Sequence, residues 1–266
     1  MNFTYRGVAR LPDLRQVILD LFFPPRCASC GRVGEWFCTA CAARVQPLMP
    51  PLCAHCSLPI SSGNLCERCR QEPSSLEGIR AAVRYVEPLR AAILRLKFSG
   101  WQAVAEPLSD YLWQVWRREP LPVDILVPVP SDKARLRARG YNQSALLARG
   151  LAKRIGKPVW EDALERTRST ARQVELTSAQ RWQNVNGAFR CRSGVMVRGQ
   201  SVLLVDDICT TGATLEACAA TLRAAGARAV WGIALARTVL PPLDWGDFLL
   251  PDAADAEWSN ASANVN

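Results

Sequence analysis

The segment from residue 202 to residue 214 constrains the fold of this chain more than any other. It starts in a near-continuous apolar run, residues 201–205, which is typical of a central parallel strand covered on both faces. The pattern then predicts a helix over residues 214–225 and a second strand over residues 229–235. Strand, helix and strand in this order indicate a right-handed parallel crossover, and therefore an α/β fold.

The loop between that strand and that helix has the composition of a phosphate site. Ligands of open α/β sheets lie outside the carboxyl ends of strands, where free N–H groups and the helix dipole favour an anion. Two adjacent carboxylates can hold sugar hydroxyls or a magnesium ion, and a glycine lets the backbone approach closely. An N-capped helix with solvated aspartates is the alternative. The candidate site residues are Asp206, Asp207, Thr210, Thr211, Gly212, Ala213 and Thr214.

Eight of the 11 cysteines form four C-x-x-C pairs. In a reducing compartment this spacing indicates metal ligation rather than disulfides, with a redox role as the alternative. The repeat favours two zinc sites built from contiguous pairs over an interleaved arrangement. Four cysteine ligands leave no open position, so we expect both zinc ions to be structural. The expected ligands are Cys27, Cys30, Cys38 and Cys41 for one site, and Cys53, Cys56, Cys66 and Cys69 for the other.

The other thiols and the single histidine give weaker signals. Cys191, Cys209 and Cys218 are scattered, and we interpret them as small apolar residues. His55 lies inside a C-x-x-C pair, which makes it either a loop residue, the preferred interpretation, or a spare metal ligand. The cysteine segment has few large apolar side chains, so zinc would supply much of its folding free energy, on the order of 10 kcal/mol or more.

The chain divides into four predicted parts. Residues 1–26 contain an amphipathic helix, which we expect to pack on the body, with contact to a partner or a membrane surface as the alternative. Residues 27–72 form a double zinc ribbon, residues 78–240 the α/β domain, and residues 241–266 a flexible tail. The α/β domain is also predicted to contain strands over 79–86 and 124–130 and helices over 89–96, 101–116 and 144–155.

Composition limits the class of protein. Hydrophobic residues make up 49% of 266 residues, which fits a globular chain rather than a disordered one. No apolar run approaches the roughly 18 residues that span a bilayer, and no signal-peptide pattern opens the sequence, so we expect a cytoplasmic location without membrane insertion. The formal net charge of +9 is compatible with phosphate-bearing ligands or nucleic acid.

Four cations follow the predicted strand at residues 124–130. They are Lys133, Arg135, Arg137 and Arg139. Cations in this place can neutralise a pyrophosphate group. A solvated basic turn and a patch for the nucleic-acid backbone are the alternatives that the sequence leaves open.

Residues 202–214 resemble the 5-phosphoribosyl-1-pyrophosphate (PRPP) motif of type I phosphoribosyltransferases. The segment 127–143, the sequence Leu96-Lys-Phe98 and the four C-x-x-C pairs resemble the ComF (competence protein F) branch of that family, over about residues 10–240. Further similarities to ComF are Gln173, Arg181, Asn184, Gly187 and Phe189. The resemblance implies a phosphoribosyltransferase-like parallel sheet flanked by helices and preceded by a small double zinc ribbon.

The same resemblance implies roles for individual residues. Asp206 and Asp207, the implied catalytic pair, hold the ribose hydroxyls, and residues 210–214 hold the 5′-phosphate. Ser131, Lys133 and Arg139 lie at the pyrophosphate. Residues 164–190 resemble a loop that closes over such sites, with Arg166, Arg168 and Arg172 as candidates for ligand contact.

The implied function is a magnesium-dependent phosphoribosyltransferase that binds PRPP and displaces pyrophosphate at C1 of the ribose. With His55 among cysteines, catalysis would depend on leaving-group neutralisation and positioning rather than on proton transfer. The ComF resemblance implies a role in natural competence, with single-stranded DNA and competence proteins as partners. A module of the same fold that binds single-stranded nucleic acid, or senses PRPP, without turnover is the alternative.

Overall fold

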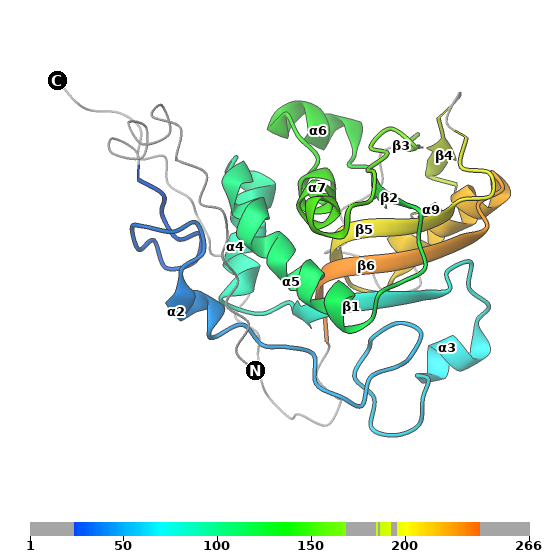
Figure 1. Cartoon of the computed structure of the whole chain (residues 1–266), viewed down its shortest axis with the longest axis horizontal. Helices are drawn as coiled ribbons and strands as arrows, with labels where there is room; N and C mark the ends of the chain where they lie inside the picture. The colour runs from blue at the N-terminus through cyan, green and yellow to red at the C-terminus, as the bar shows by residue number, and fades with distance from the viewer. Residues whose placement is uncertain (1–23, 169–184, 186, 193–195, 240–266) are drawn as a thin grey trace.

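The structure, a computed structural model, describes residues 24–168, 185, 187–192 and 196–239 (Figure 1). The predicted N-terminal helix, with its apolar stripe over residues 11–21, lies outside the described residues. The predicted tail, residues 241–266, lies outside them as well. None of the described helices combines the length and the apolar character that crossing a membrane requires.

Four parallel strands form the central sheet, in the order β1-β6-β5-β2. Their bounds are β1 Gly78–Arg84, β2 Ile125–Pro128, β5 Ser201–Cys209 and β6 Ala229–Arg237. The predicted parallel sheet is therefore confirmed. β5 lies between two strands and is buried along nearly its whole length, which accounts for its apolar run. It continues past the predicted end at Val205, because β6 pairs with it as far as Cys209.

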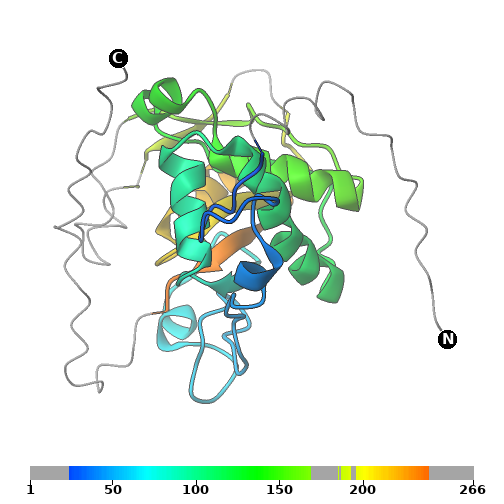
Figure 2. The same ribbon diagram turned by 90° about the vertical axis from the view of Figure 1, so that its left-hand side faces the viewer.

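Helices cover both faces of the sheet (Figures 1 and 2). The helices are α4 Leu89–Phe98, the short η1 Gln102–Val104, α5 Ala105–Arg118, α7 Gln143–Ile155 and α9 Ala213–Ala224. β5 shows how the faces divide, because successive side chains of a strand point to opposite sides. Leu203 and Val205 pack in one core with α4, α5 and α7, whereas Val202 and Leu204 pack in a second core with α9.

Two features of this half were not predicted. The basic segment forms a helix, α6 Lys133–Arg139, rather than a turn. Asp132 caps it by accepting from the backbone N–H of Ala134, and Gly140 ends it in the left-handed region, with a φ of 77°. The second feature is an antiparallel pair of short strands, β3 Leu164–Arg166 and β4 Phe189–Cys191.

The cysteine segment runs along the outer edge of β1, as Figure 1 shows. Its helices are short: α2 Thr39–Ala42 and α3 Glu67–Gln71. The N–H of Ile79 donates to His55 O (2.5 Å), and the N–H of Arg84 donates to Gln46 O (2.9 Å). Ser57 Oγ donates to the carbonyl of Ile79 (2.8 Å). These bonds pair backbone groups that an edge strand otherwise leaves open.

The first half of the cysteine segment also shares a core with the helices. Cys27, Phe37 and Cys41 belong to the same buried cluster as Leu89 of α4. The rings of Phe37 and Tyr111 of α5 meet edge to face, with centroids 6.4 Å apart. The predicted parts 27–72 and 78–240 thus follow one another in the sequence but bury side chains in one core.

Gly150→Ala tests how closely α7 packs on α5. A Cβ at Gly150 would lie 2.4 Å from Ser109 Oγ and 2.5 Å from Ser109 Cβ. Alanine normally stabilises a helix interior by about 1 kcal/mol relative to glycine, but overpacking here should destabilise the protein by roughly 1–3 kcal/mol. Urea unfolding measures the change, and adding Ser109→Gly should recover part of it. A Gly150→Ala chain as stable as the parent would contradict this close approach.

Candidate functional site

A cavity of about 790 Å³ lies at the carboxyl ends of β2 and β5. Its size is within the range of pockets that bind small molecules. Segments far apart in the sequence meet around it, namely the end of α4, the loop after β2, α6, β3 and the start of α9. The polar and charged lining includes Tyr85, Lys97, Ser131, Asp132, Arg135, Arg139, Gln143, Ser144, Arg166, Asp206, Asp207, Thr210 and Thr214.

Asp206 and Asp207 belong to the last part of β5, and only 8% and 3% of their surface is exposed. At the start of α7, Ser144 Oγ donates to Asp206 Oδ1 (3.2 Å). At the end of α4, Lys97 Nζ lies 3.0 Å from Asp207 Oδ2. Burial and then the nearby charge of Asp207 raise the pKa of Asp206 to about 7. A carboxyl with this pKa can accept or release a proton at neutral pH.

Residues 210–214, here called the phosphate loop, join β5 to α9. Gly212 is the N-cap of α9, with a φ of 87° that favours glycine. It has no side chain to cap the helix, although Thr211 Oγ1 accepts from the N–H of Ala213 (3.3 Å). Gly212, Ala213 and Thr214 line the cavity, whereas Thr211 is not part of the lining. The first turn of α9 therefore borders the cavity, the arrangement by which helices bind phosphate.

Basic side chains also border the cavity. Arg135 and Arg139 come from α6, and Arg166 comes from β3. Ser131 also lines the cavity, and its Oγ donates to Asn142 Oδ1 (3.0 Å). Lys133 is exposed in the first turn of α6 and is not part of the lining. Of the three residues that the resemblance places at a pyrophosphate, the structure brings Ser131 and Arg139 to the cavity.

Phe98 adds an aromatic face to the same cavity. It is the last residue of α4, and 70% of its surface is exposed. The guanidinium carbon of Arg139 lies 4.8 Å from the centroid of its ring. Arg139 Nη1 also donates to Gln143 Oε1 (2.8 Å), which fixes the guanidinium over the ring.

The cysteines form two groups of four, as the contiguous pairing predicts. We call Cys27, Cys30, Cys38 and Cys41 the first tetrad, and Cys53, Cys56, Cys66 and Cys69 the second tetrad. The sulfurs of each group lie within 4.8 Å of one another. Cys30 and Cys38 are 3.6 Å apart, and Cys56 and Cys66 are 3.8 Å apart. Tetrahedral zinc with bonds of about 2.3 Å requires sulfur separations of about 3.8 Å, so both tetrads fit zinc.

Some candidates from the sequence take other places. His55 is not part of either tetrad and lines a small pocket behind the phosphate loop. Of the segment that resembles a closing loop, Arg168, Gly187 and Phe189 are described, and Arg166 reaches the cavity. Arg172, Gln173, Arg181 and Asn184 lie outside the described residues.

Three functional side chains had no assigned role in the sequence analysis. Lys97, part of the Leu96-Lys-Phe98 segment that resembles ComF, pairs with Asp207. Arg68 donates to Thr211 of the phosphate loop, and Arg237 joins Cys56 of the second tetrad to Cys209. A charged residue such as Arg237, at the end of an otherwise apolar strand, is the one local signal that could have pointed to a buried partner.

Two family models match this chain. A double zinc ribbon domain matches residues 18–70, and a phosphoribosyl transferase domain matches residues 142–239. The first range contains both tetrads, and the second contains the two acids and the phosphate loop. The two halves found in the structure thus correspond to two separately recognised domain families.

Similar proteins carry both halves. The DNA utilization protein YhgH of Escherichia coli K12 is 35% identical over 214 residues, which cover 78% of this chain and 93% of YhgH. Competence protein F of Haemophilus influenzae is 30% identical over 229 residues, which cover 81% of this chain and 99% of the relative. Among solved structures, glutamine PRPP amidotransferase from B. subtilis, complexed with ADP and GMP, is 22% identical. The match covers 50% of this chain and 26% of that chain, with a TM-score of 0.35.

The purified, reduced protein should contain two zinc ions per chain. Cys27→Ser and Cys66→Ser should each remove one zinc, because each takes a ligand from a different tetrad. Elemental analysis together with native mass spectrometry counts the ions. Cys191→Ser is the matched control, since Cys191 is half-buried and belongs to neither tetrad. One zinc or none in the parent protein would contradict the two-site assignment.

Asp206→Asn should stabilise the ligand-free protein at pH 8. The folded-state pKa of about 7 exceeds the unfolded value of about 3.9, so ionised Asp206 destabilises the fold at high pH, and this penalty disappears as pH falls from 7 toward 4. The asparagine variant should gain about 1 kcal/mol or more at pH 8, or roughly 2–4 °C in Tm.

Melting curves at pH 8, 7 and 6 with zinc present check this dependence. The gap in Tm between Asp206→Asn and the parent should narrow as the pH falls through this range. Asp162→Asn, at a carboxylate that is exposed and outside the cavity lining, should show no such trend. A gap that stays constant from pH 8 to pH 6 would rule out a raised pKa for Asp206.

Proposed function

The chain belongs to the ComF (competence protein F) family, and from this premise we propose that it binds PRPP with Mg²⁺ in the cavity at the end of β5. The observation that carries the proposal is one cavity that combines two buried acids, a helix N-terminus and several cations. These are the groups that a ribose with a 5′-phosphate and a pyrophosphate requires. We further propose a role in natural competence, in handling incoming single-stranded DNA in the cytoplasm, because relatives are named for competence and DNA utilization.

In the proposed complex, the residues of this chain divide the ligand between them. The phosphate loop binds the 5′-phosphate through N–H groups at the start of α9, with Thr210 and Thr214 as hydroxyl donors. Asp206 and Asp207 accept the ribose hydroxyls. The pyrophosphate would lie near Ser131, Arg135 and Arg139. Lys133, which does not line the cavity, would contact it only after a movement of α6.

Carboxylate oxygens are the ligands that Mg²⁺ prefers, and Asp206 and Asp207 offer them beside a cavity large enough for PRPP. Bound Mg²⁺ would offset the negative charge that builds up on the departing pyrophosphate. Arg135 and Arg139 would add to this neutralisation from α6. His55 lines the small pocket behind the phosphate loop, so the proposed catalysis depends on neutralisation and positioning rather than on proton transfer.

A second candidate function, binding of single-stranded nucleic acid without turnover, is favoured by one observation. Phe98 presents an exposed ring at the cavity, backed by Arg139. Exposed aromatic rings next to cations are the usual stacking sites for unpaired bases. Phosphate groups could then follow the cations of α6, including Arg137, which is exposed. PRPP binding and strand binding would share Arg139.

Replacing both acids, Asp206→Asn with Asp207→Asn, should abolish PRPP binding and leave the protein folded. The amides lose the charge and the acceptor pairs for ribose hydroxyls. The lost charge-assisted bonds, about 1.5–3 kcal/mol each, correspond to roughly ten- to hundredfold in affinity per residue. In a thermal-shift assay, PRPP with Mg²⁺ should raise the Tm of the parent but not that of the double variant.

The control for this assay is Asp162→Asn, which should respond to PRPP as the parent does, since this carboxylate lies on the surface and pairs with Arg192. If the double variant still gains stability from PRPP, the acids are not the ribose site. If the parent itself does not respond, the PRPP proposal is wrong and strand binding becomes the leading function.

Phe98→Ala should weaken binding of an oligothymidine strand by about 1–3 kcal/mol, that is, roughly five- to 150-fold. Fluorescence anisotropy at low and moderate salt measures the affinity. Met49→Ala serves as the matched control, because Met49 is also an exposed apolar side chain but lies on the cysteine segment. Equal strand affinity for Phe98→Ala and the parent would exclude a stacking role for this ring.

A further inference from the structure

Arg237 is a buried cation whose partners are sulfur atoms. It ends β6, and 2% of its surface is exposed. Its Nη1 donates to Cys209 Sγ (2.7 Å) and its Nη2 to Cys56 Sγ (3.5 Å), while Nε has no hydrogen-bond partner in the described part of the chain. A buried guanidinium is expensive without an anion. Cys56 supplies one as a thiolate, the form in which cysteine binds zinc.

Arg68 approaches the phosphate loop from the cysteine segment. This residue lies in α3, and its Nη1 donates to the carbonyl oxygen of Thr211. The same side chain is hydrogen-bonded to Cys69, a member of the second tetrad. It also lies near Glu72, with Nε 3.9 Å from Oε2. One side chain therefore contacts the second tetrad and the phosphate loop at the same time.

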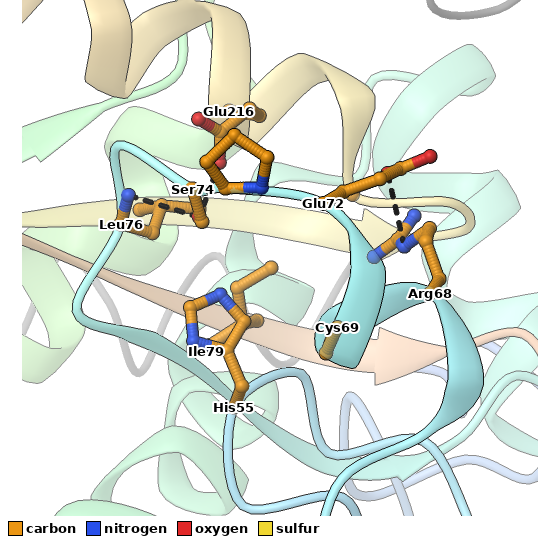
Figure 3. A pocket seen from close by; sticks show the side chains of 10 residues that line it. His55, Arg68, Cys69, Glu72, Ser74, Leu76, Ile79 and Glu216 are labelled. Atoms are coloured by element: carbon orange, nitrogen blue, oxygen red, sulfur yellow. Dashed lines mark hydrogen bonds and ion pairs between the residues drawn. The ribbon is translucent and has the colours of Figure 1, made fainter.

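The phosphate loop separates the large cavity from a small pocket. On its far side lies the small pocket of Figure 3, whose lining residues include Arg68 and Glu216. Glu216 of α9 accepts from Ser74 Oγ (2.6 Å), which ties the end of the cysteine segment to the helix. Gly212 lines both this pocket and the large cavity. A Cβ there would lie 3.3 Å from Ile79 Cδ1, so the loop rests directly on β1.

The charges of the two arginines match that of a loaded second tetrad. Four thiolates and one Zn²⁺ sum to −2, and two guanidinium groups supply +2. The first tetrad has different surroundings: Cys38 N–H donates to Cys27 Sγ (3.4 Å), and three of its four cysteines are buried with Phe37 in the helical core. Among residues 24–168 and 196–239, no hydrogen bond joins an arginine side chain to the sulfurs of the first tetrad.

We propose that Arg68 and Arg237 are positioning residues through which the second tetrad holds the phosphate loop. Cys56 and Cys69, as thiolates in the zinc-bound protein, fix the two guanidinium groups. These groups in turn hold Cys209 and Thr211, on either side of Thr210. The N–H groups of the turn are then preorganised for an anion.

A second consequence concerns binding, and it rests on the proposed function. If an anionic ligand binds the phosphate loop in this held conformation, ligand and zinc must strengthen each other's binding, because coupling between two sites is reciprocal. The first tetrad should not take part, because the described residues show no such link between it and the loop.

The first experiment needs no ligand and therefore tests the coupling independently of PRPP. Hydrogen exchange of the amides of residues 209–214 is compared for the parent, Arg68→Met and Arg70→Met. Arg70 is the matched control, because it is an exposed arginine of the same helix. Arg68→Met should speed exchange in this segment by about fivefold or more, Arg68→Lys by less, and Arg70→Met should leave it unchanged.

The second experiment measures zinc retention at each tetrad in the same sample. The zinc-loaded protein is challenged with a chelator, with and without PRPP and Mg²⁺, and freed thiols are alkylated and located by peptide mass spectrometry. PRPP should protect the four cysteines of the second tetrad by about fivefold or more, while alkylation of the first tetrad stays unchanged. Protection should be lost in Arg68→Met and kept in Arg70→Met.

The two experiments separate the two proposals. Equal exchange of the loop in Arg68→Met and Arg70→Met overturns the positioning role, whatever PRPP does. Protection of both tetrads alike, or of neither although PRPP binds, overturns the coupling between zinc and ligand. A parent that does not bind PRPP overturns the proposed function, and the exchange result then decides the positioning role alone. Arg237→Met, run beside Arg68→Met in both experiments, should give the same result; if it does not fold, the Arg68 variants decide the positioning role.

Discussion

The open edge of β1 is the constraint on which the rest of this architecture depends. A parallel strand at a sheet edge exposes N–H and C=O groups that invite pairing with other chains. Here the cysteine segment covers that edge through His55, Gln46 and Ser57, although it has few large apolar side chains of its own. Zinc at two tetrads supplies the folding free energy that such a segment lacks. The metal sites therefore complete the sheet, in addition to holding their own loops.

The same edge connects the metal sites to the ligand cavity. β1 pairs with β6, and β6 pairs with β5, so a segment that covers β1 lies two strands from the acids of β5. Arg237 makes this connection direct, because it lies at the end of β6 and donates to Cys56 of the second tetrad. Asp207 and Asp206 are held by Lys97 at the end of α4 and by Ser144 at the start of α7. The cavity thus has one wall built by the helices and one wall supported by the cysteine segment.

The sequence predicted those elements and sites whose pattern lies within a short stretch of the chain. β5 and α9 follow from an apolar run, a glycine and a helical repeat, and the tetrads follow from the C-x-x-C spacing. The end of β5 was placed too early, because two acids are not expected inside a buried strand, and only the pairing with β6 carries the strand through them. α6 has no apolar periodicity, but Asp132 and Gly140 at its ends were usable signals. The pairs Lys97–Asp207 and Arg68–Thr211 join residues over 100 positions apart, and no local pattern encodes them.

Arg68 and Arg237 lie near both the second tetrad and the loop that would bind an anionic ligand. A zinc ribbon that only holds its own loops together has no such arrangement. The phosphate loop has the second tetrad behind it and the ligand cavity in front, and Arg68 contacts both the tetrad and the loop. If the thiolate charge is lost, the buried Arg237 keeps its desolvation penalty but loses its anion, and the strain falls on Cys209 and the turn beside it. Three cysteines of the first tetrad pack instead with Phe37 in the apolar core that the helices form. Two zinc sites of identical composition can therefore serve different ends, because their neighbours differ in charge.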